Sequence, residues 1–156
     1  MQILLLKKSD FQICGCYVET SLTEHNKDVS ALYERYFNSG IAERISAVTD
    51  DYGTEYYSAT WYTQLHERYR YLFGKKVNAT TILPAEFELK SVPAASYAIA
   101  SFPQGQDVYQ AWTDFLNTTL PNAGYTPDIE GDFIEYFPDG IHGGYEIWAP
   151  LANADV

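Results

Sequence analysis

The chain has 156 residues, 46% of them hydrophobic, which is enough to bury the core of one domain without metal or disulfide staples. Its 10 Lys and Arg residues are outnumbered by 21 Asp and Glu residues, and the resulting net charge of -11 opposes contact with a nucleic-acid backbone or an anionic membrane surface. We therefore expect one soluble domain, residues 1–156, with no direct nucleic-acid partner and no membrane contact.

The N-terminal segment predicts a cytoplasmic protein. Its two lysines follow a short apolar run, the reverse of the order in a secretory signal. Cys14 and Cys16 lie two apart in strand-like sequence, so their side chains are parallel and should not bridge each other. With no Cys or His cluster nearby they also make a poor metal site. We expect buried free thiols, no metal and no other cofactor.

The first half alternates between strand and helix signals. It is predicted to contain a strand over residues 11–20, a helix from Asp28 to Gly40, and strands over residues 47–61 and 69–77. Gly15 inside the first strand indicates a close backbone approach or a bulge, and Gly74 is expected to break the last strand.

The second half repeats this order. It is predicted to contain a strand over residues 87–102, a helix from Asp107 closed by Pro121 and Gly124, and strands over residues 133–137 and 145–151. Asp107 follows Asp28 by 79 positions, and the apolar residues after each aspartate share one helical stripe. The pattern predicts an α+β fold of two strand-helix-strand-strand modules, about residues 1–83 and 84–156, although two amphipathic helices can also resemble each other by chance.

Aromatic residues are unusually frequent, with 14 Tyr, 8 Phe and 3 Trp. Tyr and Trp offer large flat surfaces with a polar tip, which suits a cleft for apolar ligands. Tyr57, Trp61 and Tyr71 fall in aromatic runs on predicted strands and are candidates for such a cleft. Cross-strand pairs that stiffen a sheet account for some of the aromatic residues.

The last strand carries the main candidate for a binding residue. Alternation sends Tyr145, Ile147 and Ala149 to one face and Glu146 and Trp148 to the other. The first set suits a face packed under helices. The second set either lines a recess or lies on an ordinary solvent face. A carboxylate among aromatic rings is poorly solvated and attracts a positive charge, so a recess there would select lipophilic cations.

The remaining polar candidates are less specific. Glu135 lies inside an apolar strand and either enters the same site or faces water. His25, His66 and His142 have loop-like or polar surroundings and no ligand spacing, so we expect surface histidines. No phosphate-binding loop, nucleophile elbow or metal motif is present in the sequence.

Taken together, these segments resemble the GyrI-like small-molecule-binding domain, also known as the effector-binding domain of AraC-type regulators. The resemblance covers nearly the whole chain and is carried by the order and spacing of its short motifs. These are Phe11-Gln-Ile-Cys-Gly15, Tyr52-Gly53, Tyr69-Arg-Tyr-Leu-Phe-Gly74, Leu83-Pro84, Val92-Pro-Ala-Ala-Ser-Tyr97, Trp112, Leu120-Pro-Asn-Ala-Gly-Tyr125, Glu135 and Glu146-Ile-Trp-Ala-Pro150.

The resemblance implies a pseudo-twofold groove between the modules that takes hydrophobic, often cationic drugs, the multidrug-binding behaviour of the family. Carried onto matching positions, it implies Glu146 as the pocket carboxylate and Tyr97, Trp148 and Tyr71 as walls. It also implies a stand-alone member, because no helix-turn-helix segment precedes the domain in this sequence.

The favoured interpretation is a protein that senses or sequesters small molecules, and two alternatives to it stay open. Some GyrI-like proteins hydrolyse strained cyclopropane-bearing genotoxins, and here Glu146 would act as general acid or base while Tyr97 polarises a carbonyl. Gyrase-inhibitor members suggest instead an antagonist that binds a gyrase-like protein through the acidic surface. Exposed aromatic residues could also form a homodimer interface.

Overall fold

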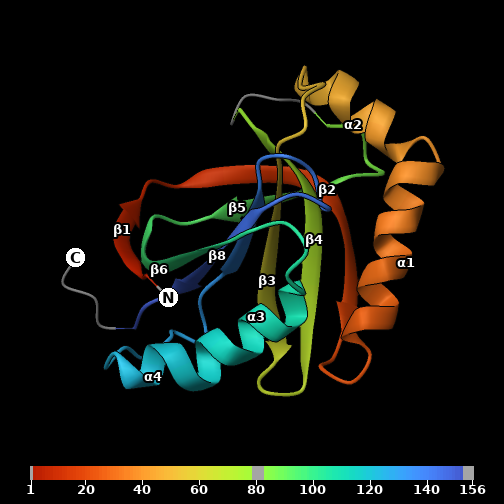
Figure 1. The fold of residues 1–156 in the computed structure, drawn as a ribbon. Coiled ribbons are helices and arrows are strands. Elements are labelled where there is room, and N and C mark those ends of the chain that lie inside the picture. The colour runs from red at the N-terminus through yellow and green to blue at the C-terminus, as the bar shows by residue number, and fades with distance from the viewer. Residues whose placement is uncertain (1, 79–82, 153–156) are drawn as a thin grey trace.

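The computed structural model describes residues 2–78 and 83–152, which form an eight-stranded antiparallel sheet with helices on one face (Figure 1). In chain order the elements are β1 (Leu4–Lys8), β2 (Phe11–Thr20), α1 (His25–Asn38), α2 (Ile41–Thr49), β3 (Tyr56–Gln64), β4 (Arg68–Val77), β5 (Glu88–Val92), β6 (Ala95–Phe102), α3 (Val108–Asp114), the π-helical turn η1 (Phe115–Thr119), α4 (Leu120–Asn122), β7 (Phe133–Phe137) and β8 (Tyr145–Pro150). In this part of the chain no helix is long and apolar enough to cross a bilayer.

The sheet is built from two equivalent halves, in the order β1-β6-β8-β7-β3-β4-β2-β5. Outward from the central β7–β3 pair, one half runs β3, β4, β2 and the other β7, β8, β6. Each half is therefore a strand, a helical segment and two further strands, and the predicted duplication is confirmed. The two edge strands are exchanged: β1 precedes the first half but pairs with β6 of the second, and β5 precedes β6 but pairs with β2.

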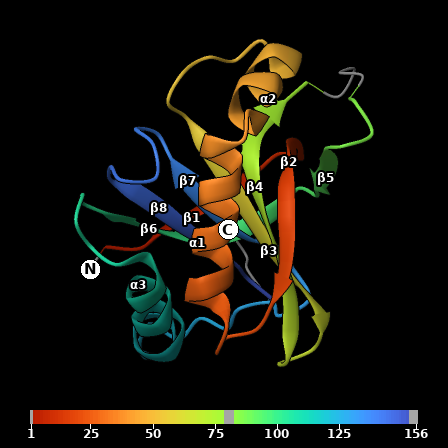
Figure 2. The same ribbon diagram turned by 90° about the vertical axis from the view of Figure 1, so that its right-hand side faces the viewer.

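The helices cover one face of the sheet and share one core with it. In Figure 2, α1 and α3 lie on the same side of the strands. The stripe predicted for the first helix is buried there, with Val29, Leu32 and Tyr36 all inside, and Ala111 and Phe115 bury the corresponding face of α3 and η1. Tyr145, Ile147 and Ala149 belong to the same core, as alternation predicts.

The other face of the sheet holds a second core, because the sheet is strongly curved. Phe11 of β2 and Trp148 of β8 are separated by three strands, yet their ring centroids lie 6.2 Å apart. Lys90 of β5 likewise reaches Asp132, just before β7, at 3.1 Å. The sheet thus curls around this face and buries Tyr57, Tyr97 and Trp148, while its other aromatic residues are partly buried.

Two glycines allow the closest contact between strands. Gly15 of β2 pairs with Gly74 of β4. A Cβ atom on Gly15 would lie 2.0 Å from the carbonyl oxygen of Phe73, and one on Gly74 would lie 1.9 Å from that of Cys14. The close approach predicted at Gly15 is confirmed, but β4 runs through Gly74 without a break, because Gly74 is the other half of that contact.

Three segments differ from the strands predicted or not predicted for them. Residues 47–49 end α2 instead of beginning a strand, because Ile41, Ile45 and Val48 have helical spacing and pack on the core. The strand expected over residues 87–102 is divided into β5 and β6 around Pro93, which has no backbone N–H for a ladder. The N-terminal apolar run, to which no element was assigned, forms β1 on the edge of β6.

Candidate functional site

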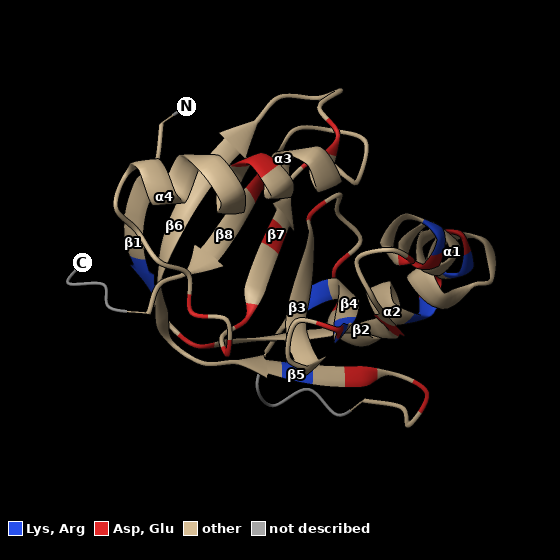
Figure 3. Cartoon of the chain, turned by 90° about the horizontal axis from the view of Figure 1, so that it is seen from below, with Lys and Arg blue, Asp and Glu red and all other residues tan. Residues whose placement is uncertain are grey.

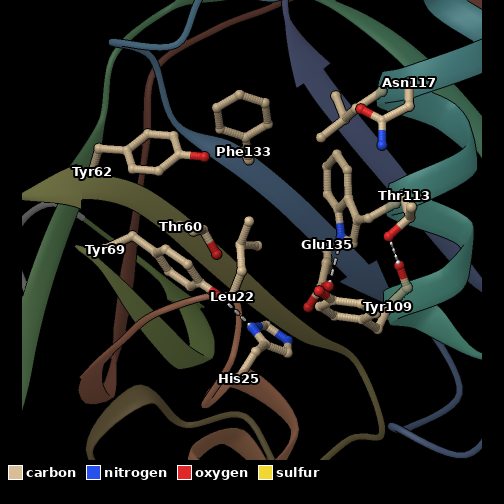
Figure 4. Close-up of a pocket in the computed structure, with 12 residues that line it drawn as sticks. Leu22, His25, Thr60, Tyr62, Tyr69, Tyr109, Thr113, Asn117, Phe133 and Glu135 are labelled. Carbon is tan, nitrogen blue, oxygen red and sulfur yellow. Dashed lines mark hydrogen bonds between the residues drawn. The ribbon is translucent and has the colours of Figure 1, made fainter. Parts of the chain in front are cut away.

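A cavity of about 320 Å³ lies on the helix face, between the two halves of the molecule (Figure 4). Its volume is at the lower end of the range for small-molecule sites. The strands β3, β4 and β7 supply its floor, and α1, α3 and η1 supply its walls. The residues around it are Leu22, His25, Thr60, Tyr62, Tyr69, Tyr109, Trp112, Thr113, Leu116, Asn117, Phe133 and Glu135.

Glu135 is the carboxylate of this cavity. It points from β7 to the helix face and is only 4% exposed. Its Oε1 accepts hydrogen bonds from the Ser58 hydroxyl at 2.8 Å and the Tyr71 hydroxyl at 2.6 Å, while its Oε2 accepts from Nε1 of Trp112 at 2.8 Å. Three neutral donors from three elements therefore fix both oxygens.

The two helices reach this carboxylate from pseudo-equivalent positions. Trp112 follows Tyr33 by the same 79 positions that separate Asp107 from Asp28. Trp112 donates directly to Glu135, whereas the Tyr33 hydroxyl is hydrogen-bonded to that of Tyr71, which donates to Glu135. The duplicated helices thus converge on one acidic group at the centre of the sheet.

No cation of the described residues neutralises Glu135. None of the ion pairs within residues 2–78 and 83–152 includes it. Lys75, the fully buried lysine, is held instead by the carbonyl of Gly53 at 2.7 Å and by Asp51 at 3.3 Å. Figure 3 shows that α3 and α4 carry no Lys or Arg. Among the described residues that line the cavity there is likewise no Lys or Arg.

His25 also lines the cavity, so the expectation of a surface histidine is wrong for this residue. It is half-buried, and its Nδ1 lies 2.6 Å from the Tyr69 hydroxyl (Figure 4). The helix begins at His25 and not at Asp28, and this earlier start places the imidazole against β4. His66 and His142 are exposed, as predicted.

A π-helical turn shapes the wall on the second module. Between α3 and α4 the backbone N–H of Leu120 donates to the carbonyl of Phe115, five residues earlier instead of four. This turn therefore contains one residue more than an α-helical turn. Phe115 stays in the core while Leu116 and Asn117 line the cavity. Such turns often occur at functional sites, and sequence periodicity does not reveal them.

The structure divides the predicted binding residues between the two faces of the sheet. Glu135 lines the cavity and Tyr71 is hydrogen-bonded to it. The other five predicted residues, namely Glu146, Trp148, Tyr97, Tyr57 and Trp61, lie on the opposite, curled face.

Glu146, expected to be the pocket carboxylate, therefore lies outside this cavity, and Glu135 is the carboxylate that lines it. Glu146 accepts from Nε1 of Trp148 at 2.9 Å, and Trp148 is 5% exposed among the rings of Tyr97 and Tyr57. Burial raises the pKa of Tyr97 to about 12. Glu146 and Tyr97, the pair considered for catalysis, thus lie outside the cavity.

Most of the cavity wall was not predicted. Tyr69, Tyr62 and Tyr109 are aromatic, but nothing in their local sequence distinguishes them from tyrosines of a packed sheet. Trp112 was recognisable from its place in the repeat. No cluster of three metal-ligating side chains occurs among the residues that the structure describes.

Comparison with known proteins identifies a family model that matches most of the chain. A family model described as Cass2, integron-associated effector binding protein, matches residues 5–151. A search of curated protein sequences found none that matches this chain.

Solved structures with the same fold cover almost the whole chain. SAV2435 bound to tetraphenylphosphonium is 13% identical with a TM-score of 0.76, and the match covers 98% of this chain and 95% of that one. A transcription regulation protein from Staphylococcus aureus is 15% identical, with a TM-score of 0.72 and coverage of 98% and 99%. An integron cassette protein from Vibrio cholerae is 15% identical, with a TM-score of 0.69 and coverage of 96% and 95%. The fold predicted from the resemblance is confirmed.

Proposed function

Because the chain belongs to the Cass2 family of integron-associated effector-binding proteins, which bind small molecules, we propose that its cavity takes lipophilic cations and that Glu135 is the residue that selects them. One observation carries the proposal. Glu135 is a buried carboxylate with three neutral hydrogen-bond donors and no ion-pair partner among the described residues.

Burial of an unpaired charge is costly, and a positive ligand beside Glu135 offsets that cost. The hydrogen bonds hold the carboxylate in place before a ligand arrives, so little ordering is needed on binding. A metal ion or a strongly hydrated ammonium would lose much of its water, and Glu135 is the one carboxylate that the described lining residues offer in exchange.

The aromatic walls favour cations that are large and apolar. Tyr62, Tyr69, Tyr109, Trp112 and Phe133 surround the cavity, and their ring faces attract a delocalised positive charge. SAV2435, which shares the fold, was solved with tetraphenylphosphonium, a cation of this kind. This supports the chemical class of the ligand, not its identity.

A titration of tetraphenylphosphonium by calorimetry tests the proposal. The variant Glu135→Gln keeps the shape of the side chain but removes its charge, so we expect it to weaken binding by about tenfold or more. Glu146→Gln is the matched control: it removes a carboxylate from the other face of the sheet and should leave the affinity unchanged. Equal binding by wild type and Glu135→Gln, or loss of binding only in Glu146→Gln, would contradict the proposal.

A neutral ligand of similar shape distinguishes the contribution of charge to the affinity from that of the aromatic rings. Triphenylphosphine oxide carries similar aromatic rings without a positive charge, so we expect it to bind the wild type more weakly than tetraphenylphosphonium does. Its affinity should change little in Glu135→Gln, because no ion pair is lost.

A further inference from the structure

His25 is a second titratable group in the cavity, and it has no role in the cation selection proposed for Glu135. Its imidazole lies among three tyrosine rings, with centroid distances of 5.9 Å to Tyr69, 5.8 Å to Tyr71 and 5.4 Å to Tyr109. One ring nitrogen, Nδ1, is occupied by the Tyr69 hydroxyl. The other ring nitrogen is turned away from Tyr69 (Figure 4).

The charged groups around His25 come from three elements. Asp28 lies one turn along α1, where Glu24 and Lys27 form an exposed pair with each other. Asp107 caps α3 across the cavity, and Glu135 projects from β7. β4 contributes only the uncharged hydroxyls of Tyr69 and Tyr71.

These groups act on the imidazole in opposite directions. Burial lowers the pKa of His25 below its ordinary value near 6.5, whereas the charges of Glu135, Asp107 and Asp28 raise it. Burial is the larger effect, so the ring is neutral at pH 7 and gains its proton at a lower pH than an ordinary histidine does.

We propose that His25 makes the cavity a proton-linked site, in which a bound organic cation and a protonated imidazole exclude each other beside Glu135. This inference rests on the function proposed above. The imidazolium places a second positive charge in the cavity that Glu135 lines, which repels the ligand and offsets the attraction of the carboxylate for it. Acidification therefore releases the cation, and by reciprocity a bound cation makes His25 harder to protonate.

The affinity for tetraphenylphosphonium, measured by calorimetry from about pH 8 to about pH 5, tests the linkage. The probe has no titratable group, so any change in affinity comes from the protein. Wild type should lose at least about fivefold in affinity across this range. His25→Gln, which keeps a polar side chain but does not titrate, should show no comparable loss. His142→Gln, in an exposed loop, is the matched control and should follow the wild type.

A second measurement does not depend on a variant. The His25 ring resonances, followed by NMR in wild type, should titrate at lower pH when tetraphenylphosphonium is bound than when it is absent. An unchanged midpoint, or a loss of affinity in His25→Gln as steep as in wild type, overturns the linkage and leaves the proposed function intact. Absence of binding by wild type at pH 8 overturns the proposed function itself.

Discussion

Glu135 and Glu146 lie on neighbouring strands but have opposite environments. In the β7–β8 register Glu135 is opposite Ile147, and Glu146 is opposite Tyr136. Residues opposite each other share a face, so the two carboxylates must point to different sides of the sheet. Glu135 meets the helices and the cavity, whereas Glu146 meets the ring of Trp148.

Trp148 gives a direct test of this division. It packs against Phe11, Tyr57, Tyr97 and Tyr136 in the second core. Trp148→Ala should lower the free energy of unfolding by about 3–5 kcal/mol, measured by urea denaturation. Affinity for tetraphenylphosphonium should persist in the fraction that stays folded. Lost binding with little loss of stability would instead assign Trp148 to the ligand site.

The cysteines were predicted as buried free thiols, and both are free and buried. Burial raises the pKa of Cys14 to about 11 and also raises that of Cys16. At pH 8 only about one Cys14 thiol in a thousand is then ionised, so native protein should react with iodoacetamide far more slowly than unfolded protein. Because the pKa lies above the working range, the rate should rise about tenfold per pH unit up to that value. Rapid labelling of native protein at pH 8, followed by mass spectrometry, would contradict this.

At the scale of elements, the strands β7 and β8 were more predictable than the start of the first helix. The short apolar run Phe133–Phe137 located β7 at its observed bounds, because residues on both of its faces are buried. The start of α1 was placed three residues late, since His25 and its neighbours are polar and no apolar stripe marks them. Because of this error, His25 was assigned to a loop and was not predicted to line the cavity.

The Gly15–Gly74 contact predicts a large effect for a single methyl group. Gly15→Ala would place a Cβ against the Phe73 carbonyl and force β2 and β4 apart, so we expect a loss of about 3 kcal/mol or more in the free energy of unfolding. Gly53→Ala is the control. Its Cβ would meet Asp51 at 3.4 Å, an ordinary contact, and the change should stay within about 1 kcal/mol. Similar urea midpoints for the two variants would show that the strands can separate at no cost.

At the scale of the whole molecule, the repeat was the most informative signal in the sequence. It predicted two modules and aligned Tyr33 with Trp112, and the structure connects both side chains to Glu135, Trp112 directly and Tyr33 through Tyr71. The face that carries the cavity could not be predicted, because both faces of the sheet are rich in aromatic residues. The curvature that fills one face depends on contacts between distant strands, such as Phe11 with Trp148.

The exchanged edge strands predict that the two modules unfold together. β1 is held by β6 and β5 by β2, and the central β3–β7 pair joins the halves, so neither half keeps its sheet without the other. Urea unfolding followed by far-UV circular dichroism and by tryptophan fluorescence should give one coincident transition, since Trp61 reports on β3 and Trp148 on β8. Fragments 1–83 and 84–156 should each be unfolded alone. Two separate transitions, or a folded fragment, would show that the modules are independent and that the cavity between them can open by their separation.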